Sequence, residues 1–340
     1  MTTSPVNTRR FLVLFCLILA PFVLRAGDPP RLSRQDRIRL TEMFNLAEAV
    51  QDSIWPGWSK APFALLLVTQ DYEYLLRHPH ATHNFDTLGY DTDLRSKVLY
   101  RKRLFARNLL AAMPAINGIS TIVAGQPGQT GQPNPANWIL TVLHEHFHQF
   151  QQSQPGYYST TQALGLSHGD QSGMWMLNYP FPYDSADVNR LFSESCQALH
   201  EALTAPTELL PSTLRNYLSA RSRFQNALST DDYSYFSLQL WQEGVARYTE
   251  YRVAATAAAN LHGADRFPSF RMSSFSFMAD SIRSGILSQL PALSLAKLRR
   301  VTFYTYGAAE AMLLDKVRPD WQVDYMNRKF FLEKYFRKAE

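Results

Sequence analysis

The first change of hydrophobic pattern along this 340-residue chain comes at its N-terminus. Arg9 and Arg10 precede an apolar run over residues 11–24, and polar residues follow it. The run is shorter than the roughly 20 residues that a bilayer-spanning helix needs, but it is typical of a signal peptide. We therefore predict that residues 1–26 are a signal peptide and that the body is exported, to the periplasm or as a secreted protein. An uncleaved N-terminal membrane anchor is the alternative.

In the first part of the body, up to about residue 152, the spacing of apolar residues is helical at first, then typical of strands, and then helical again. Ser33 is a candidate N-cap for a helix whose apolar positions continue to about Ile54. Short apolar runs then predict strands, and a loop rich in glycine, glutamine and proline leads into a second helix. The expected strands cover residues 64–69, 72–76, 98–105 and 118–124, the loop covers 125–135, and the helix covers 134–152.

The remainder of the chain has an almost wholly helical periodicity. Strands first and helices second indicate an α+β fold that is mostly helical, with a small N-terminal sheet and a helical C-terminal lobe. The expected helices lie near residues 185–203, 211–228, 233–259, 269–288, 306–317 and 321–336.

Composition indicates an ordinary globular body and excludes some partners. Hydrophobic residues make up 46% of the chain, which is enough for a large core. The formal net charge of +5 becomes +2 without residues 1–26, which hold three arginines and no acid. Basic residues elsewhere are scattered or lie on an expected helix face over residues 94–107, so no nucleic-acid partner is expected. Cys196 would be the one cysteine of the mature chain, best interpreted as a small buried residue.

The pattern most informative about chemistry is His-Glu-x-x-His at residues 144–148. His144 and His148 lie four residues apart on the expected helix, so both imidazoles can reach one Zn²⁺ ion. Glu145 lies beside that ion, where its carboxylate can take a proton from zinc-bound water. His146 is expected to point away from the ligands, at the surface or behind one of them. A pair of solvated or packed helix histidines is the alternative to a metal site.

Zinc in a hydrolytic site usually takes a third protein ligand, and Glu243 is the best candidate downstream. It opens an expected apolar-faced helix, and Gly244 beside it allows another backbone to approach closely. Glu250 falls within roughly 20° of the same helix face and could support one of the ligands. An ordinary carboxylate at a helix start is the alternative for Glu243. The rival third ligands are Glu194, His200 and Glu201.

These motifs resemble those of the gluzincin metallopeptidases, notably the aminopeptidase-N-like branch. The zinc helix of that branch is similar to His144-Glu145-x-x-His148-Gln149 followed by an aromatic residue. Its third-ligand helix is similar to Glu243-Gly244-x-Ala246-x-Tyr248-x-Glu250-Tyr251, and its tyrosine element is similar to Tyr304-x-x-Gly307.

The resemblance implies a thermolysin-like zincin core in which Glu243 is the third zinc ligand. It also implies that the Tyr304 hydroxyl stabilises the oxyanion, with Tyr306 as the fallback. The 94 residues between His148 and Glu243 exceed the spacing in that branch, which indicates an insertion.

We therefore expect a zinc-dependent metallopeptidase that hydrolyses peptide bonds in a peptide or protein substrate, with zinc-bound water activated by Glu145. One alternative is a non-peptidase zinc hydrolase that acts on an ester or an epoxide. Another is a catalytically inactive envelope binding protein of the same fold. A membrane partner is expected only if the N-terminal segment stays uncleaved.

The body, residues 27–340, is expected to be one catalytic domain with three parts. Residues 27–152 hold the sheet and the zinc helix, residues 153–232 form a helical insertion, and residues 233–340 hold the third-ligand helix and a helical lobe. Within the insertion, the loop over residues 169–183 could form a substrate wall or lid, or could simply pack. Its aromatic residues are Trp175, Tyr179, Phe181 and Tyr183.

Overall fold

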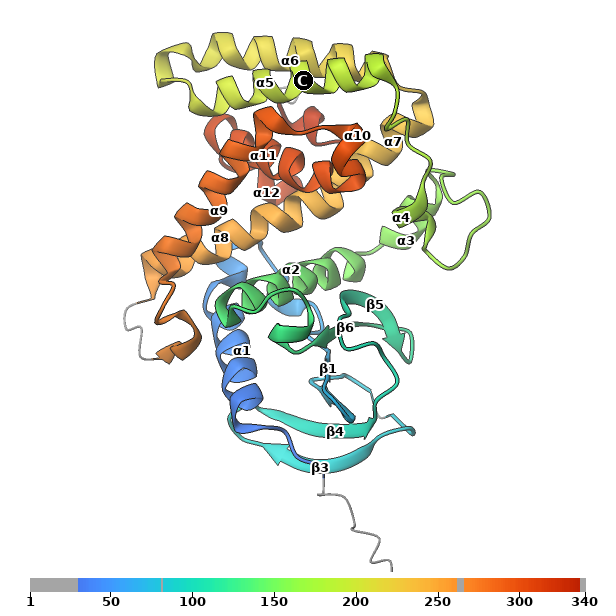
Figure 1. The fold of residues 1–340 in the computed structure, drawn as a ribbon, viewed down its shortest axis with the longest axis vertical. Helices are drawn as coiled ribbons and strands as arrows, with labels where there is room; N and C mark the ends of the chain where they lie inside the picture. Colours follow the sequence, from blue (N-terminus) through green and yellow to red (C-terminus); the bar gives the residue numbers. More distant parts are fainter. Residues whose placement is uncertain (1–29, 81, 262–265, 337–340) are drawn as a thin grey trace, which may run out of the picture. The chain divides into compact units, whose positions relative to one another are not determined.

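A six-stranded mixed sheet and a larger set of helices build this protein, which confirms the predicted α+β class (Figure 1). The computed structural model describes residues 30–80, 82–261 and 266–336. The chain divides into two compact units, residues 1–31 and 32–340, and the elements below all belong to the second. The predicted signal peptide lies outside the described residues. None of the helices in the described part of the chain has the length and hydrophobicity to cross a membrane.

Helix α1 (Arg34–Ile54) begins where the sequence predicts. The Ser33 side chain accepts a hydrogen bond from the backbone N–H three residues on, at 3.0 Å, which confirms the predicted N-cap. Beyond the helix the chain turns at Gly57, whose φ of 84° lies in the left-handed region that favours glycine. Trp55 before this turn is buried, so the exit from the helix is fixed by core packing.

The sheet has the strand order β3-β4-β2-β1-β6-β5, in which β1 and β6 are parallel and the other neighbouring pairs are antiparallel. The expectation of a helix face over residues 94–107 is wrong, because a strand occupies the middle of that segment. The strands that match expected positions are β1 (Leu65–Val68), β2 (Tyr72–Leu76), β4 (Ser96–Lys102) and β6 (Ile119–Gly125).

Two further strands, β3 (Asp86–Asp91) and β5 (Leu110–Ile116), are not predicted, and both lie at edges of the sheet. Strand β3 is mostly exposed, so its sequence lacks the apolar alternation that marks a half-buried strand. Strand β5 contains Pro114, which an edge strand tolerates because one side of it needs no partner. A prediction based on patterns of buried apolar residues therefore misses these two edge strands.

Helix α2 (Pro135–Ser153) carries the His-Glu-x-x-His motif and packs with α1 against one face of the sheet. The sequence predicts that the helix begins at Asn134; this residue is instead its N-cap, because its side-chain oxygen accepts a hydrogen bond from the Ala136 N–H at 2.8 Å. The strand residues on this face, among them Leu67 and Ile122, belong to the main hydrophobic core. Burial on this side therefore fixes how α2 lies against the sheet.

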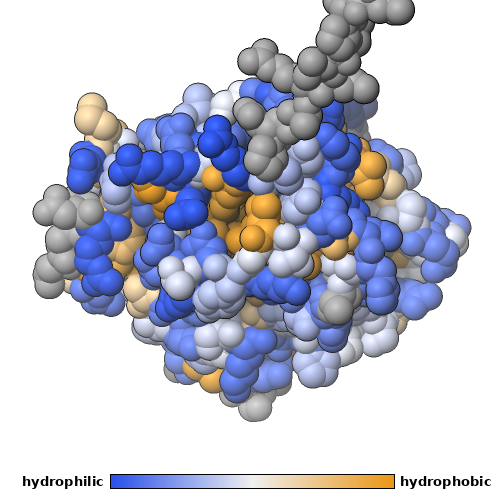
Figure 2. Space-filling view, turned by 90° about the horizontal axis from the view of Figure 1, so that it is seen from below, coloured by the Kyte–Doolittle hydropathy of each residue, from blue (hydrophilic) through white to orange (hydrophobic). Residues whose placement is uncertain are grey.

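The opposite face of the sheet has a second, smaller core. Figure 2 shows the molecule from below, a largely hydrophilic face with hydrophobic residues near its middle. Period-2 alternation along the strands sends neighbouring side chains to the two cores. The buried members of the smaller core are Leu66, Val68, Leu75, Ile116 and Val123.

The C-terminal part of the chain is helical, as predicted. Its longer helices are α5 (Ala186–Thr204), α6 (Leu210–Asn226), α7 (Thr230–Gln239), α8 (Val245–Asn260), α9 (Phe275–Gln289) and α11 (Thr302–Val317). Its shorter helices are α3 (Tyr157–Gln162), α4 (Trp175–Asn178), α10 (Leu295–Leu298) and α12 (Trp321–Asp324).

Two of the expected helices differ from the structure. The helix expected over residues 233–259 is divided by a π-helical turn (Leu240–Gly244) between α7 and α8. The helix expected over residues 321–336 is limited to α12 and a later 3₁₀ turn (Leu332–Phe336). In both regions the apolar spacing is helical, and tertiary packing decides where the regular α-helix is interrupted.

Candidate metal centre

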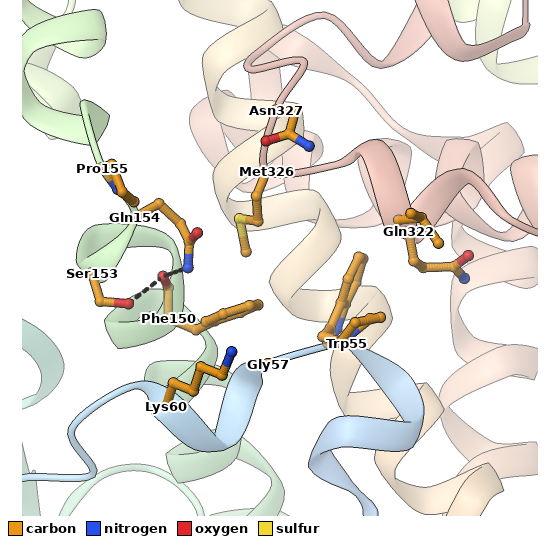
Figure 3. A pocket seen from close by; sticks show the side chains of 12 residues that line it. Trp55, Gly57, Lys60, Phe150, Ser153, Gln154, Pro155, Gln322, Met326 and Asn327 are labelled. Atoms are coloured by element: carbon orange, nitrogen blue, oxygen red, sulfur yellow. Dashed lines mark hydrogen bonds between the residues drawn. The ribbon is translucent and has the colours of Figure 1, made fainter.

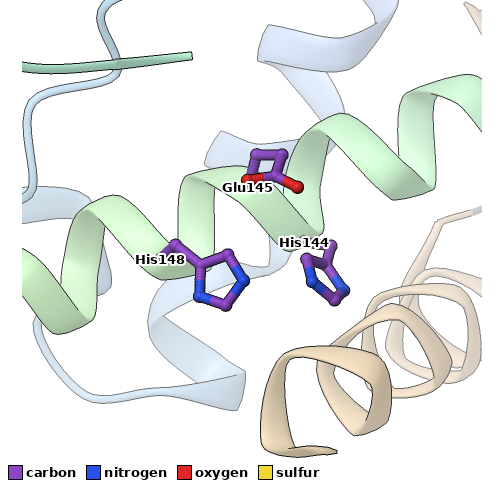
Figure 4. A group of neighbouring side chains, drawn as sticks. All are labelled: His144, Glu145 and His148. Atoms are coloured by element: carbon purple, nitrogen blue, oxygen red, sulfur yellow. The ribbon is translucent and has the colours of Figure 1, made fainter. Parts of the chain in front are cut away.

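Helix α2 brings its two histidines and its glutamate together. The ligand atoms of His144, Glu145 and His148 all lie within 4.8 Å of one another. Figure 4 shows both imidazole rings on the same side of α2, with His144 turned toward α8. The two histidines are each only 5% exposed, so they are enclosed by the fold rather than solvated.

Glu243 comes from the π-helical turn and faces both histidines. Its Oε2 lies 3.6 Å from His144 Nε2 and 3.4 Å from His148 Nε2. The expectation that Glu243 opens a helix is wrong, because α7 leads into the π turn without a break. A π turn shifts the direction of a side chain relative to the α-helical spacing, and such turns are frequent at functional sites. One carboxylate oxygen and two imidazole nitrogens thus converge on a single point.

The rival third ligands lie elsewhere. Glu194 on α5 is bound to Arg190 at 2.7 Å and to Arg223 at 3.4 Å, with 40% of its side chain exposed. Glu201 on the same helix is exposed and accepts from Gln197 at 3.1 Å. Of the five carboxylates considered, the structure brings Glu145, Glu243 and Glu250 to the histidines.

The outer nitrogen of each predicted ligand is held by a side-chain oxygen. His144 Nδ1 lies 2.8 Å from Glu250 Oε1, as expected for a supporting carboxylate, and His148 Nδ1 lies 2.7 Å from Gln151 Oε1. An oxygen at Nδ1 fixes a proton there and leaves the Nε2 lone pair free for a metal ion. Sequence reasoning missed Gln151, although its position three residues after His148 on an amphipathic helix is a usable signal.

Gln151 is itself fixed by other groups. Its amide donates to the Trp241 carbonyl at 3.1 Å and to the Tyr325 hydroxyl at 2.7 Å. The side chain is fully buried, so none of these bonds competes with water. His148 is therefore oriented through a buried relay that connects α2, the π turn and the segment after α12.

Electrostatics make this cluster a favourable place for a cation. Burial acts to raise the pKa of Glu243, but His148 and His144 outweigh it and hold that pKa well below the ordinary value. Burial acts to lower the pKa of His144, but its hydrogen bonds with Glu243 and Glu250 raise the pKa from 6.5 to about 10. Carboxylates around two imidazoles stabilise a positive charge, which a proton or a divalent metal ion can supply.

Glu145 faces the edge of the sheet. Its Oε2 accepts a hydrogen bond from the Ala112 N–H of β5 at 2.8 Å. Burial raises the pKa of Glu145 against the opposing effect of His148 and His144. A half-buried carboxylate with a raised pKa takes up a proton more readily than an exposed one.

The two tyrosines proposed for the oxyanion have different surroundings. The Tyr304 ring lies 6.1 Å from the His144 ring and nearly parallel to it. The Tyr306 hydroxyl instead lies 2.5 Å from the hydroxyl of Ser195 on α5, in the buried core. Burial and the charge of Glu243 raise the pKa of Tyr304, so its hydroxyl stays protonated at neutral pH. Tyr304 is therefore the tyrosine at the cluster.

Arg300 also contacts the cluster, and sequence reasoning missed it. Its Nη1 lies 3.3 Å from Glu243 Oε1, the carboxylate oxygen that does not face the histidines. It precedes α11 in a short 3₁₀ turn (Arg299–Val301). No pattern in the sequence marks it, because its contact depends on how α11 packs against the π turn.

His146 lies neither at the surface nor behind one of the predicted ligands. Its ring stacks on Phe63 at 3.7 Å between ring centres and on Trp58 at 5.3 Å, and only 1% of the residue is exposed. Its Nδ1 lies 3.0 Å from Gln149 Oε1. The expected direction away from the ligands agrees with this position, but the expectation of exposure is wrong.

The aromatic loop of the insertion is largely packed. Tyr179 and Phe181 are buried, and the Tyr179 ring stacks on Tyr235 at 4.2 Å. Trp175 and Tyr183 are half-buried. Cys196 is fully buried, as expected for a small core residue. Packing thus accounts for two of the four aromatic residues.

Two cavities differ in their relation to the cluster. The larger, about 410 Å³, lies at the C-terminal end of α2, and its lining includes Trp55, Lys60 and Phe150 but none of the predicted ligands (Figure 3). A smaller cavity of about 210 Å³ is bordered by Glu250 and Arg247, which bind each other. The smaller cavity is the one next to the histidine cluster, because Glu250 contacts His144.

No protein-family model, curated protein or solved structure matches this chain. Donor chemistry and geometry are therefore the basis for a function. Two imidazole nitrogens and one carboxylate oxygen are the donor set of a hydrolytic zinc site with a position left open. The buried oxygens at both Nδ1 atoms also fit such a site.

Proposed function

We propose that this protein is a zinc-dependent metallopeptidase with a thermolysin-like core of the gluzincin type. The observation that supports it best is the convergence of His144 Nε2, His148 Nε2 and Glu243 Oε2. These three groups would hold one Zn²⁺ ion. The ion would supply Lewis-acid chemistry, polarising a carbonyl and lowering the pKa of water.

The residues of this chain have separate tasks in the proposed reaction. Glu145 takes a proton from the attacking water and passes it to the leaving amine, for which its raised pKa is suited. The Ala112 N–H holds the Glu145 carboxylate in place. The protonated Tyr304 hydroxyl donates to the oxygen on which negative charge develops.

Strand β5 favours a peptide over an ester or an epoxide. It is the last strand of the sheet on the side of β6, and its Ala112 N–H is directed out of the sheet toward Glu145. An edge strand can pair with an extended peptide through main-chain hydrogen bonds, which a small ester or epoxide cannot form. A peptide bound along β5 would lie across the proposed catalytic groups.

Metal analysis and hydrolysis test this function together. Purified wild type should hold about one zinc ion, and His148→Ala and Glu243→Ala should lose it, because each removes one of three ligands. Glu145→Gln should keep zinc and lose hydrolysis. Stoichiometric zinc in both ligand variants would contradict the site, and full activity in Glu145→Gln would contradict the mechanism.

Substrate libraries separate the proposed peptidase from its alternatives. Zinc-loaded wild type should cleave members of a peptide library, and Glu145→Gln should not. Cleavage of esters or epoxides alone would support the non-peptidase hydrolase. A zinc-loaded protein that cleaves no library would support the inactive envelope binding protein.

We also propose that residues 1–26 direct export of the body. The apolar run over residues 11–24 and the arginines before it are the support for this proposal. N-terminal sequencing of the protein recovered from an exporting bacterial host should begin at residue 27. A protein recovered from the membrane with residue 1 intact would support the uncleaved anchor instead.

A further inference from the structure

The two oxygens of Glu243 have different partners. Oε2 faces the Nε2 atoms of His144 and His148, at 3.6 and 3.4 Å. Oε1 lies 3.3 Å from Nη1 of Arg300. The carboxylate is thus shared between the point where the donor atoms converge and a guanidinium on its other side.

Arg300 is held in this position from a second direction. Its Nη1 also donates to Gln239 Oε1 at 3.2 Å, and Gln239 lies one helical turn before Glu243. Gln239 is 1% exposed, and its amide donates to the Met176 carbonyl at 3.3 Å. The Arg300 side chain is 22% exposed, so solvent screens its contact with Glu243 only in part.

A carboxylate can bind a metal ion through one oxygen or through both. When both oxygens of a third ligand bind zinc, they occupy a position that a hydrolytic site keeps open for water or substrate. A guanidinium that already binds one oxygen competes with the ion for it, because a hydrogen bond between two charged groups is stronger than one between neutral groups.

This inference rests on the zinc site proposed above. We propose that Arg300 is a positioning residue that restricts Glu243 to coordination of the metal ion through Oε2. It does so by binding Oε1, and Gln239 holds Arg300 in place. The guanidinium keeps the open coordination position free without touching the substrate or the ion.

Two simpler roles for Arg300 make different predictions. If the guanidinium only repelled the ion, its removal would strengthen zinc binding and leave the coordination number unchanged. If it only held Glu243 in place, its removal would weaken zinc binding about 10-fold or more. Restriction to one oxygen instead predicts that zinc stays bound while the number of bound oxygens rises.

The test uses Co²⁺ in place of zinc in the full chain, because four-coordinate Co²⁺ absorbs visible light several-fold more strongly than five-coordinate Co²⁺. Arg300→Met removes the donor, and Arg300→Lys retains a cation. Arg299→Met is the matched control, because the adjacent Arg299 is half-exposed and binds Asp184 at 2.7 Å, away from Glu243. Zinc affinity of each variant is measured by competition with a chelator.

We expect Arg300→Met to retain zinc within about threefold of the wild-type affinity while its Co²⁺ absorption falls about twofold or more. Arg300→Lys should recover most of the wild-type spectrum, and Arg299→Met should match wild type. Gln239→Leu, which removes the anchor but leaves Arg300, should have an intermediate spectrum and provides a second test if Arg300→Met does not fold.

Identical spectra for Arg300→Met and wild type would overturn the proposal, and so would a 10-fold loss of zinc affinity in Arg300→Met. A wild type that binds neither ion would overturn both this proposal and the zinc site. A wild type that binds Co²⁺ with the expected spectra but cleaves no peptide would contradict the proposed peptidase function and leave the role of Arg300 standing.

Discussion

Gly244 and Gly307 meet backbone to backbone, where α11 crosses the π turn. A Cβ placed on Gly244 would lie 2.5 Å from the Gly307 Cα, and a Cβ on Gly307 would lie 2.8 Å from the Gly244 Cα. Glu243 precedes the first glycine by one residue, and Tyr304 precedes the second by three. The contact between the two glycines therefore sets the register that brings Glu243 and Tyr304 to the same place.

Substitution of either glycine by alanine should damage both stability and metal binding. The new methyl group has no space against the opposite backbone, so Gly244→Ala and Gly307→Ala should each lower the free energy of unfolding by about 1–3 kcal/mol. Zinc affinity should fall as well, because α11 and the π turn must move apart. Urea unfolding and chelator competition measure the two effects.

Gly285 in α9 provides the control, because a Cβ there would meet no atom within 4 Å. Gly285→Ala should raise the free energy of unfolding by roughly 0.5–1 kcal/mol, since alanine is the better helix former. Equal stability of Gly244→Ala and Gly285→Ala would show that the contact between the glycines does not constrain the fold.

The close approach at Gly244 is one of the features that the sequence predicts correctly. The approach follows from the missing side chain of glycine. The four-residue spacing of His144 and His148 likewise predicts their convergence, which follows from helix geometry. Gln151 and Arg300 were both missed: Gln151 lies three residues after His148 on the same helix, which is a usable signal, whereas the Arg300 contact depends on how α11 packs against the π turn. The π turn escapes prediction for a similar reason, since its sequence keeps a helical apolar spacing.

Loss of the Gln151 side-chain oxygen should weaken metal binding without unfolding the protein. Gln151→Leu removes the acceptor at His148 Nδ1, so zinc affinity should fall about 10- to 100-fold. Tyr325→Phe removes only the hydroxyl to which the Gln151 amide donates, so its effect should be smaller. Chelator competition with zinc measures both variants.

Gln154→Leu is the control for this comparison. Gln154 lies almost one turn further along the chain, and its amide donates to the Phe150 carbonyl rather than to a group at the proposed metal site. Its zinc affinity should equal that of wild type. If Gln151→Leu binds zinc as tightly as Gln154→Leu, the relay to His148 has no role in metal binding.

His146 should make the protein less stable in mild acid. Burial lowers the pKa of His146 from 6.5 to about 3, against a weaker opposing effect of Gln149. Between these values the unfolded chain binds a proton that the folded protein does not, so stability is complete above pH 6.5 and falls as the pH decreases toward 3. The loss attributable to His146 between pH 7 and pH 5 is about 2 kcal/mol.

Urea unfolding of wild type and His146→Phe measures this contribution, with chelator present so that release of metal does not add to it. Phenylalanine keeps the stack on Phe63 and does not titrate. The loss of stability from pH 7 to pH 5 should be about 2 kcal/mol smaller in the variant. Equal losses in the two proteins would show that His146 takes up its proton without unfolding.

Tyr304→Phe should lower activity and leave stability unchanged, whereas Tyr306→Phe should lower stability and leave activity unchanged. Removing the Tyr304 hydroxyl takes away the proposed oxyanion donor, so kcat should fall about 10²- to 10³-fold while zinc affinity and the unfolding midpoint stay close to wild type. Removing the Tyr306 hydroxyl leaves the buried Ser195 hydroxyl without its partner, so the free energy of unfolding should fall by about 1–3 kcal/mol with kcat unchanged. Peptide hydrolysis and urea unfolding measure both variants. A large loss of kcat in Tyr306→Phe, with Tyr304→Phe fully active, would transfer the oxyanion role to Tyr306. Helix α11 would then have to rotate in the active protein.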